Sequence, residues 1–245
     1  GKSTIRNIVR THPSGLWDGI QQMLNQQETL TEVSLGGQTI NGSAQFFYAL
    51  IAMTCLYGCF IGFGSAITLQ ANLTALAARR CVTPTHKLKL ILSEQIASFL
   101  LGYFDVIVLL IYLRYILKLD FQGKIGPMLL ISFFGSLIGV SIGIFVGSLG
   151  KMKEGGKIGI ILGFSMVCSF LSGLMNNTMK DLIEKNMPVI NRINPAALIS
   201  DAFYCINVYD DPARYYRNLL TLAVMSSALV FASFLLIRRN RYDSI

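Results

Sequence analysis

The sequence predicts an all-α membrane protein, a polytopic bundle of helices, and its composition and its apolar blocks carry that prediction. The 245 residues are 53% apolar and 14% charged, whereas soluble domains carry about 25% charged residues. Five blocks come close to or exceed the roughly 20 apolar residues with which a helix crosses a bilayer; they are 46–69, 96–117, 127–149, 158–175 and 219–237. None alternates like a barrel strand, so each predicts a helix.

Proline after a capping or small residue marks where several helices begin. This pattern occurs at Thr83–Pro84, Gly126–Pro127, Asn194–Pro195 and Asp211–Pro212. Proline fits the first turn of a helix, and Asn, Asp or Thr can cap the N–H groups that this turn leaves unpaired. In chain order, we expect the four pairs to open the second span, the third span, a shorter helix over 195–207 and the helix that becomes the fifth span.

Lysine and arginine are concentrated in alternate connections between the blocks. Loop 70–95, loop 151–157 and the C-terminal tail hold ten of them: Arg79, Arg80, Lys87, Lys89, Lys151, Lys153, Lys157, Arg238, Arg239 and Arg241. Short cytoplasmic loops carry such an excess, so we expect this side and the C-terminus to be cytoplasmic and residues 1–45 to be extracytoplasmic. The same distribution explains the net charge of +8 without a nucleic-acid partner.

This orientation divides the chain into an extracytoplasmic segment, 1–45, and a transmembrane domain, 46–245. The first segment is polar, begins with Gly1 rather than Met, and contains no signal peptide. An outside segment without a signal predicts one further span ahead of Gly1. The five blocks would then belong to a six-span protein with both termini in the cytoplasm.

No residue pattern predicts an enzyme. The five cysteines and two histidines are scattered without metal-ligand spacing, and no Ser/His, paired-Asp or HExxH arrangement is present. Gly1-Lys2-Ser3-Thr4 resembles the end of a phosphate-binding loop, but the residues that follow contain no strand-rich nucleotide domain. We therefore expect no catalytic residue, no metal and no cofactor in this chain.

Glycine recurs every fourth residue in the third block. The series consists of Gly135, Gly139, Gly143 and Gly147, and shorter series occur at Gly58 and Gly62 and at Gly155, Gly159 and Gly163. This spacing places glycines on one helix face, where the backbone of a neighbouring helix can approach closely. The series predicts close packing within the bundle; the alternatives are a subunit interface and a surface that slides during a conformational cycle.

Asp105 lies in the middle of the second block, in the stretch "GYFDVIVLL". An ionisable residue at that depth is costly and indicates a function by default. Arg114 lies nine residues further on, about 13 Å along the axis and near the opposite face, so the two are not expected to pair; Arg114 can instead extend to the outer surface. Asp105 has either a structural, hydrogen-bonded role or a role in a translocation path or ion coupling.

A basic stretch, "LAARRCVTPTHKLKLILSEQ", separates the first two blocks. Residues 70–82 predict a short helix at the cytoplasmic surface, with an apolar stripe and two basic residues, before a proline that ends it: Leu73, Leu76, Ala77, Arg79, Arg80 and Pro84. The stretch is either an ordinary orientation signal or a lever, a short helix docked on a cytoplasmic partner.

The segment 176–218 is too polar to span a membrane, but residues 195–207 have an apolar face at helical spacing. We expect a short helix in the outer leaflet, packed on the last two spans, that closes the outer end of a substrate route. Pro195, Ile199 and Phe203 are its candidate gate residues. The alternative is a mobile outer loop.

Three of these stretches resemble the ABC-2 type permeases of ATP-binding-cassette transporters. They are "LAARRCVTPTHKLKLILSEQI", similar to a coupling helix and the entry into the next span, "INPAALISDAFYCINVYDD", similar to the outer re-entrant or amphipathic helices, and "LLIRRNRYDSI", similar to the basic tail. The resemblance covers residues 45–245 and rests on span order and loop character.

The resemblance implies a permease subunit that works with a second permease chain, in a homo- or heterodimer, and with separate ATPase subunits that hold ATP and Mg²⁺. The coupling helix would transmit motion from the ATPase to the spans, and the substrate would be a drug, a peptide, a lipid-like molecule or an ion. From the residues alone, an ion-coupled secondary transporter that uses Asp105 remains the alternative.

Overall fold

The computed structural model describes residues 42–67, 87–118, 125–149, 152–175, 183 and 185–239, and within these residues it contains helices and no strand. Five helices are long: α3 (Gly42–Ile67), α5 (Lys87–Tyr115), α6 (Ile125–Gly147), α7 (Glu154–Leu171) and α11 (Pro212–Arg239). All five are long and apolar enough to cross a membrane. The predicted all-α, polytopic fold is therefore confirmed.

The long helices begin before the apolar blocks that predicted them. The difference is largest for α5, which begins at Lys87 whereas its block begins at 96, and for α11, which begins at Pro212, as the Asp211–Pro212 pair predicted, whereas its block begins at 219. An apolar block reports only where the side chains suit hydrocarbon, whereas the backbone hydrogen bonds of a helix continue through polar turns at its ends.

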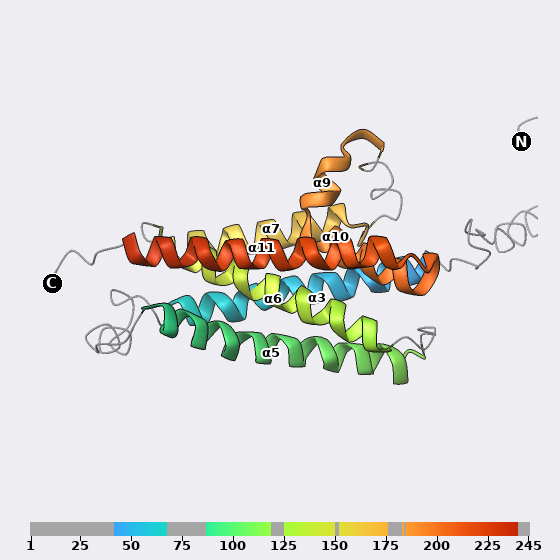
Figure 1. The fold of residues 1–245 in the computed structure, drawn as a ribbon, viewed down its shortest axis with the longest axis horizontal. Coiled ribbons are helices and arrows are strands. Elements are labelled where there is room, and N and C mark those ends of the chain that lie inside the picture. The colour runs from blue at the N-terminus through green and yellow to red at the C-terminus, as the bar shows by residue number, and fades with distance from the viewer. Residues whose placement is uncertain are drawn as a thin grey trace, which may run out of the picture. The chain divides into compact units, whose positions relative to one another are not determined.

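Three shorter helical segments connect α7 to α11: α9 (Pro188–Ile193), α10 (Pro195–Tyr204) and the π-helical turn η2 (Cys205–Tyr209). They lie at the end of the bundle where α6 and α11 begin, which we call the α10 end. In Figure 1, α9 projects from the bundle, while α10 lies beside α11.

The predicted capping residues open their helices. The Asn194 Oδ1 accepts hydrogen bonds from the N–H groups of Ala196 at 2.9 Å and Ala197 at 3.4 Å. At the start of α11, the Asp211 Oδ1 accepts from Ala213 at 3.0 Å and from Arg214 at 3.1 Å. Pro127 lies in the first turn of α6. Thr83–Pro84 and the six residues of the expected coupling helix lie outside the described residues.

Helix α6 is the centre of the bundle and contacts α3, α5, α7, α10 and α11. Its most extensive contact is with α3, and most of its residues are buried, the glycine series Gly135–Gly147 included. A helix of this kind positions the others, because every neighbour packs against the same rigid element.

Helix α10 is more deeply packed than the sequence predicted. It contacts α7 and α11 as expected, but it also packs on α6 and, most extensively, on α3. Every residue from Pro195 to Tyr204 is buried, Ser200 and Asp201 included. The segment is therefore a helix enclosed on all sides, not an amphipathic helix with one solvent face and not a loop. Of its two buried polar residues, Asp201 is hydrogen-bonded to Arg214 and Asn218 of α11, whereas the Ser200 hydroxyl has no hydrogen-bond partner among the described residues.

Candidate functional site

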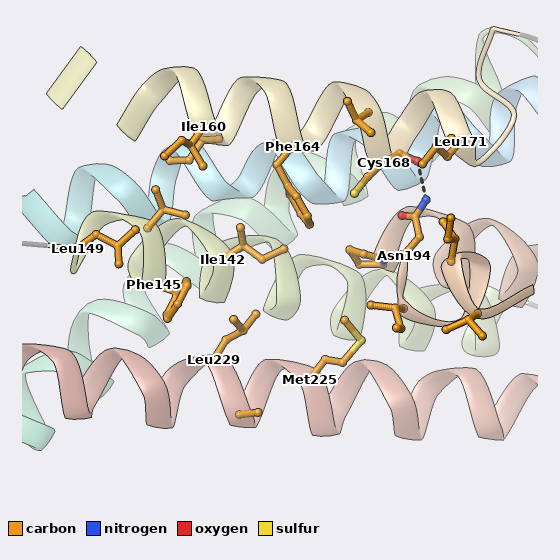
Figure 2. A pocket seen from close by; sticks show the side chains of 18 residues that line it. Ile142, Phe145, Leu149, Ile160, Phe164, Cys168, Leu171, Asn194, Met225 and Leu229 are labelled. Atoms are coloured by element: carbon orange, nitrogen blue, oxygen red, sulfur yellow. Dashed lines mark hydrogen bonds between the residues drawn. The ribbon is translucent and has the colours of Figure 1, made fainter. Parts of the chain in front are cut away.

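An apolar cavity of about 780 Å³ lies between α6, α7 and α11, with α9 and the start of α10 at one end. Figure 2 shows Phe164 extending from α7, and Met225 and Leu229 from α11, toward the space between the helices. The lining is aliphatic, aromatic or sulfur-containing apart from the amide of Asn194. Such a surface can bind hydrocarbon or rings but offers almost nothing to a charge.

Helical spacing brings the lining side chains together. On α7 the lining positions include Ile160, Phe164, Cys168 and Leu171, which recur at intervals of three and four and so lie on one face. Because α7 packs on α3, α6 and α10, and α11 packs on α6 and α10, the two helices stand on either side of the cavity. Phe164 is 43% exposed, so the cavity opens to the surface of the bundle between them.

Asn194 fixes the end of this cavity. Its Oδ1 caps α10, while its Nδ2 donates to the carbonyl oxygen of Cys168 at 2.9 Å. That carbonyl belongs to the last turn of α7 and also accepts a hydrogen bond from the backbone N–H of Ser172 at 3.1 Å. One buried side chain thus joins the beginning of α10 to the end of α7.

A second, polar pocket of about 360 Å³ lies between α9, α10 and α11. At its base, the Asp201 carboxylate accepts hydrogen bonds from Arg214 Nε and Nη2 at 2.8 Å each, and from Asn218 Nδ2 at 2.8 Å. Arg192 of α9 and Arg217 of α11 also line it. The bidentate ion pair explains how a carboxylate whose side chain is 11% exposed is tolerated inside the bundle.

Sequence reasoning missed Asp201 and its partners. A signal was present, because an acid in the apolar run "LISDAFYC" requires a cationic or donor partner if that run is buried. The identity of the partner was not accessible, since Arg214 is 13 residues away and on another helix.

The glycine series of α6 lies against α3. A Cβ on Gly139 would overlap the backbone carbonyl of Cys55, and a Cβ on Gly143 would overlap that of Cys59. Gly135 faces Cys55 and also Ile199 of α10, and Gly147 faces Ala66 of α3. By contrast, a Cβ on Gly155, Gly159 or Gly163 of α7 would meet no atom within 4 Å among the described residues.

The other candidate residues do not come together in one site. Asp105 is exposed on α5, has no hydrogen bond or ion pair with the described part of the chain, and lines neither pocket. Of the candidate gate residues, Pro195 lines the apolar cavity, whereas Phe203 stacks on Tyr48 of α3 with ring centroids 5.8 Å apart. Ile199, which faces Gly135, is fully buried.

Comparison with known proteins identifies a family to which the chain is similar. A family model described as "ABC-2 family transporter protein" matches residues 3–235. No curated protein and no solved structure matches the chain.

Proposed function

Because the chain belongs to the ABC-2 family of transporters and is a multi-pass membrane component of that family, we propose that it is the permease subunit of an exporter for apolar or amphipathic molecules. A separate ATPase chain supplies the energy. The substrate is lipid-like or drug-like, and it binds in the apolar cavity between α6, α7 and α11.

The single observation that supports this choice of substrate is the chemistry of the cavity wall. Its volume of about 780 Å³ is within the range of about 300–1,000 Å³ that is usual for small-molecule sites. An ion or a peptide backbone would lose its hydration there and find only the Asn194 amide in exchange. A hydrocarbon chain or an aromatic ring loses nothing by entering.

The geometry also supports a route with one closed end. The distribution of Lys and Arg favours an extracytoplasmic position for the α10 end, where α9, α10 and Asn194 close the cavity. The opening between α7 and α11 faces sideways, as an entry from the bilayer requires. In this proposal α10 is the outer gate, and residues 71–82 couple the permease to the ATPase.

The test is substrate-stimulated ATP hydrolysis by the intact transporter complex, purified with its ATPase and reconstituted in proteoliposomes. Phe164→Ser removes an aromatic wall of the cavity, and Leu162→Ser is the matched control, because Leu162 is exposed to 46% on the same helix but does not line the cavity. We expect Phe164→Ser to abolish stimulation by a fluorescent phospholipid analogue and Leu162→Ser to retain it. Equal stimulation of both variants, or absence of any ATPase from the purified complex, would contradict the proposal.

The alternative of an ion-coupled transporter has no structural observation in its favour. Asp105 is the residue on which it depends, and neither pocket is lined by any described residue of α5. Transport that continues on an ion gradient without ATP would nevertheless establish it.

A further inference from the structure

We propose that the polar pocket between α9, α10 and α11 binds the anionic head group of an amphipathic molecule whose apolar part lies in the apolar cavity. The ligand chemistry is a phosphate or carboxylate joined to hydrocarbon. The inference rests on the proposed function and deepens it, since it names the class of substrate.

The charge of the pocket favours an anion. Three guanidinium groups line it, those of Arg192, Arg214 and Arg217, against the one carboxylate of Asp201, which leaves a net charge of +2. The Asp201 carboxylate already accepts hydrogen bonds from Arg214 and Asn218. Neither Arg192 nor Arg217 forms an ion pair with the described residues. Planar guanidinium groups are well suited to the oxygens of phosphate and carboxylate.

Arg214 can take part although it is already paired. It donates to Asp201 through Nε and Nη2 only, whereas a guanidinium has five N–H donors. Its side chain lines the pocket and is 41% exposed, whereas that of Asp201 is 11% exposed, so a ligand in the pocket can reach the Arg214 side chain. Asp201 and Asn218 thereby hold Arg214 in place for an anion that arrives from outside.

The position of the pocket connects it to the apolar cavity. One face of α11 lines both: Arg214, Asn218 and Thr221 line the polar pocket, and Met225 and Leu229 line the cavity. These positions follow each other at intervals of three or four residues and so form one stripe. Thr221 and Met225 are one turn apart, about 6 Å along the axis.

Helix α9 contributes to both sites in the same way. Ile190 and Ile193 line the apolar cavity, and Arg192, between them in the chain, lines the polar pocket. The change from cationic to apolar, around α9 and along α11, matches a molecule with an anionic head and a hydrocarbon body. A wholly apolar drug would use the cavity alone and leave the arginines without a role.

The experiment uses the reconstituted complex and two fluorescent lipid analogues with identical chains, one with an anionic phosphate head group and one with the uncharged hydroxyl head group of a diacylglycerol. The test variant is Arg192→Ala combined with Arg217→Ala. The control is Arg114→Ala, which removes an exposed arginine that is at the same end of the bundle, on α5, and lines neither pocket. Thermal unfolding of each complex verifies folding, and Arg192→Lys combined with Arg217→Lys retains the charge as a second variant.

We expect the alanine variant to raise the KM for the anionic analogue about tenfold, since charge-assisted hydrogen bonds are lost, with little change for the uncharged diacylglycerol analogue. The lysine variant should recover part of the difference, and Arg114→Ala should behave as wild type. An equal effect of the alanine variant on both analogues, or no effect on either, overturns the inference while transport itself still supports the proposed function. If the wild-type complex transports neither lipid analogue, the proposed function is contradicted instead.

A further experiment distinguishes the head group of an amphiphile from a free inorganic anion as the occupant of the polar pocket. Inorganic phosphate is added as a competitor during transport of the anionic analogue. We expect no inhibition by millimolar phosphate, because the apolar cavity supplies the rest of the binding. Inhibition by millimolar phosphate would show that a free anion occupies the pocket and would overturn the assignment to an amphiphile.

Discussion

Asp201 and Asp105 are both carboxylates within apolar helices, and their surroundings are opposite. Asp201 is buried and binds Arg214 and Asn218, whereas Asp105 is exposed on α5 and has no partner in the described part of the chain. The hydropathy of the sequence singled out Asp105 and passed over Asp201. A carboxylate is stabilised by its neighbours rather than by its position along a helix, so only the neighbours distinguish the two.

We expect Asp201→Ala to lower the free energy of unfolding by about 1–3 kcal/mol, because it leaves Arg214 and Asn218 without their acceptor. The loss should be moderate for a broken ion pair, since the Arg214 side chain is 41% exposed and water replaces part of the interaction. Thermal unfolding of the purified complex in detergent measures it.

Asp105→Ala is the control for this prediction, because it removes an exposed carboxylate that has no hydrogen bond or ion pair among the described residues. Its effect on stability should remain within about 0.5 kcal/mol. If the two alanine variants unfold at the same temperature, the ion pair does not stabilise the bundle.

Helices α6 and α7 contain glycines at the same four-residue spacing, and the structure uses the two series differently. Gly139 and Gly143 of α6 lie directly against backbone carbonyls of α3, while Gly159 and Gly163 of α7 face open space. A small residue allows close approach but does not create a partner. For α6 the partner is α3; the open glycine face of α7 has none in the described residues.

Gly139→Leu and Gly143→Leu should each destabilise the bundle by at least about 1 kcal/mol, because α3 and α6 must separate to admit the side chain. Gly163→Leu, with no atom in the way, should leave the stability of the isolated chain unchanged. Thermal unfolding and the yield of correctly inserted protein measure both. Wild-type stability of Gly139→Leu would mean that α6 does not pack on α3 as observed.

The short helix expected over residues 71–82 lies outside the described residues, and its role as a coupling element remains a prediction. Replacing Leu76 and Arg79 together by alanine should leave membrane insertion and assembly intact but lower substrate-stimulated ATP hydrolysis, because the lever loses its apolar and its charged contact. The ratio of stimulated to basal ATPase activity measures this. An unchanged ratio in the fully assembled variant would remove these residues from the coupling path.

The molecule as a whole is a bundle around α6, with the apolar cavity open on one side and closed by α9 and α10 at one end. Because α10 packs on α3, α6, α7 and α11 at once, it cannot move without changing contacts with four long helices. A gate built in this way would open together with a rearrangement of the spans, as a transport cycle driven from the other end of the bundle requires.

Single cysteines test this gate in a chain from which the five native cysteines have been removed. Ser200 and Phe203 are fully buried, and Tyr209, which is 49% exposed, provides the positive control. With a membrane-impermeant thiol reagent, Tyr209→Cys should react rapidly, while Ser200→Cys and Phe203→Cys should react slowly and accelerate only when ATP analogues trap the complex. Rapid labelling at all three positions in every nucleotide state would rule out a gate.

The sequence by itself determined the features that depend only on the side chains of neighbouring residues in the chain. The length of each apolar block set the five spans, and Asn194 and Asp211 set the starts of α10 and α11, because a span needs only hydrocarbon-compatible side chains and a cap acts within one turn. The tertiary structure alone decided which faces of those helices meet. In a bilayer the lipid-facing and the protein-facing sides are both apolar, so hydropathy cannot separate them. For this reason the packed glycines of α6 and the open glycines of α7 look alike in sequence. The pairing of Asp201 with Arg214 and the apolar cavity between α6, α7 and α11 could be recognised only once the helices were placed together.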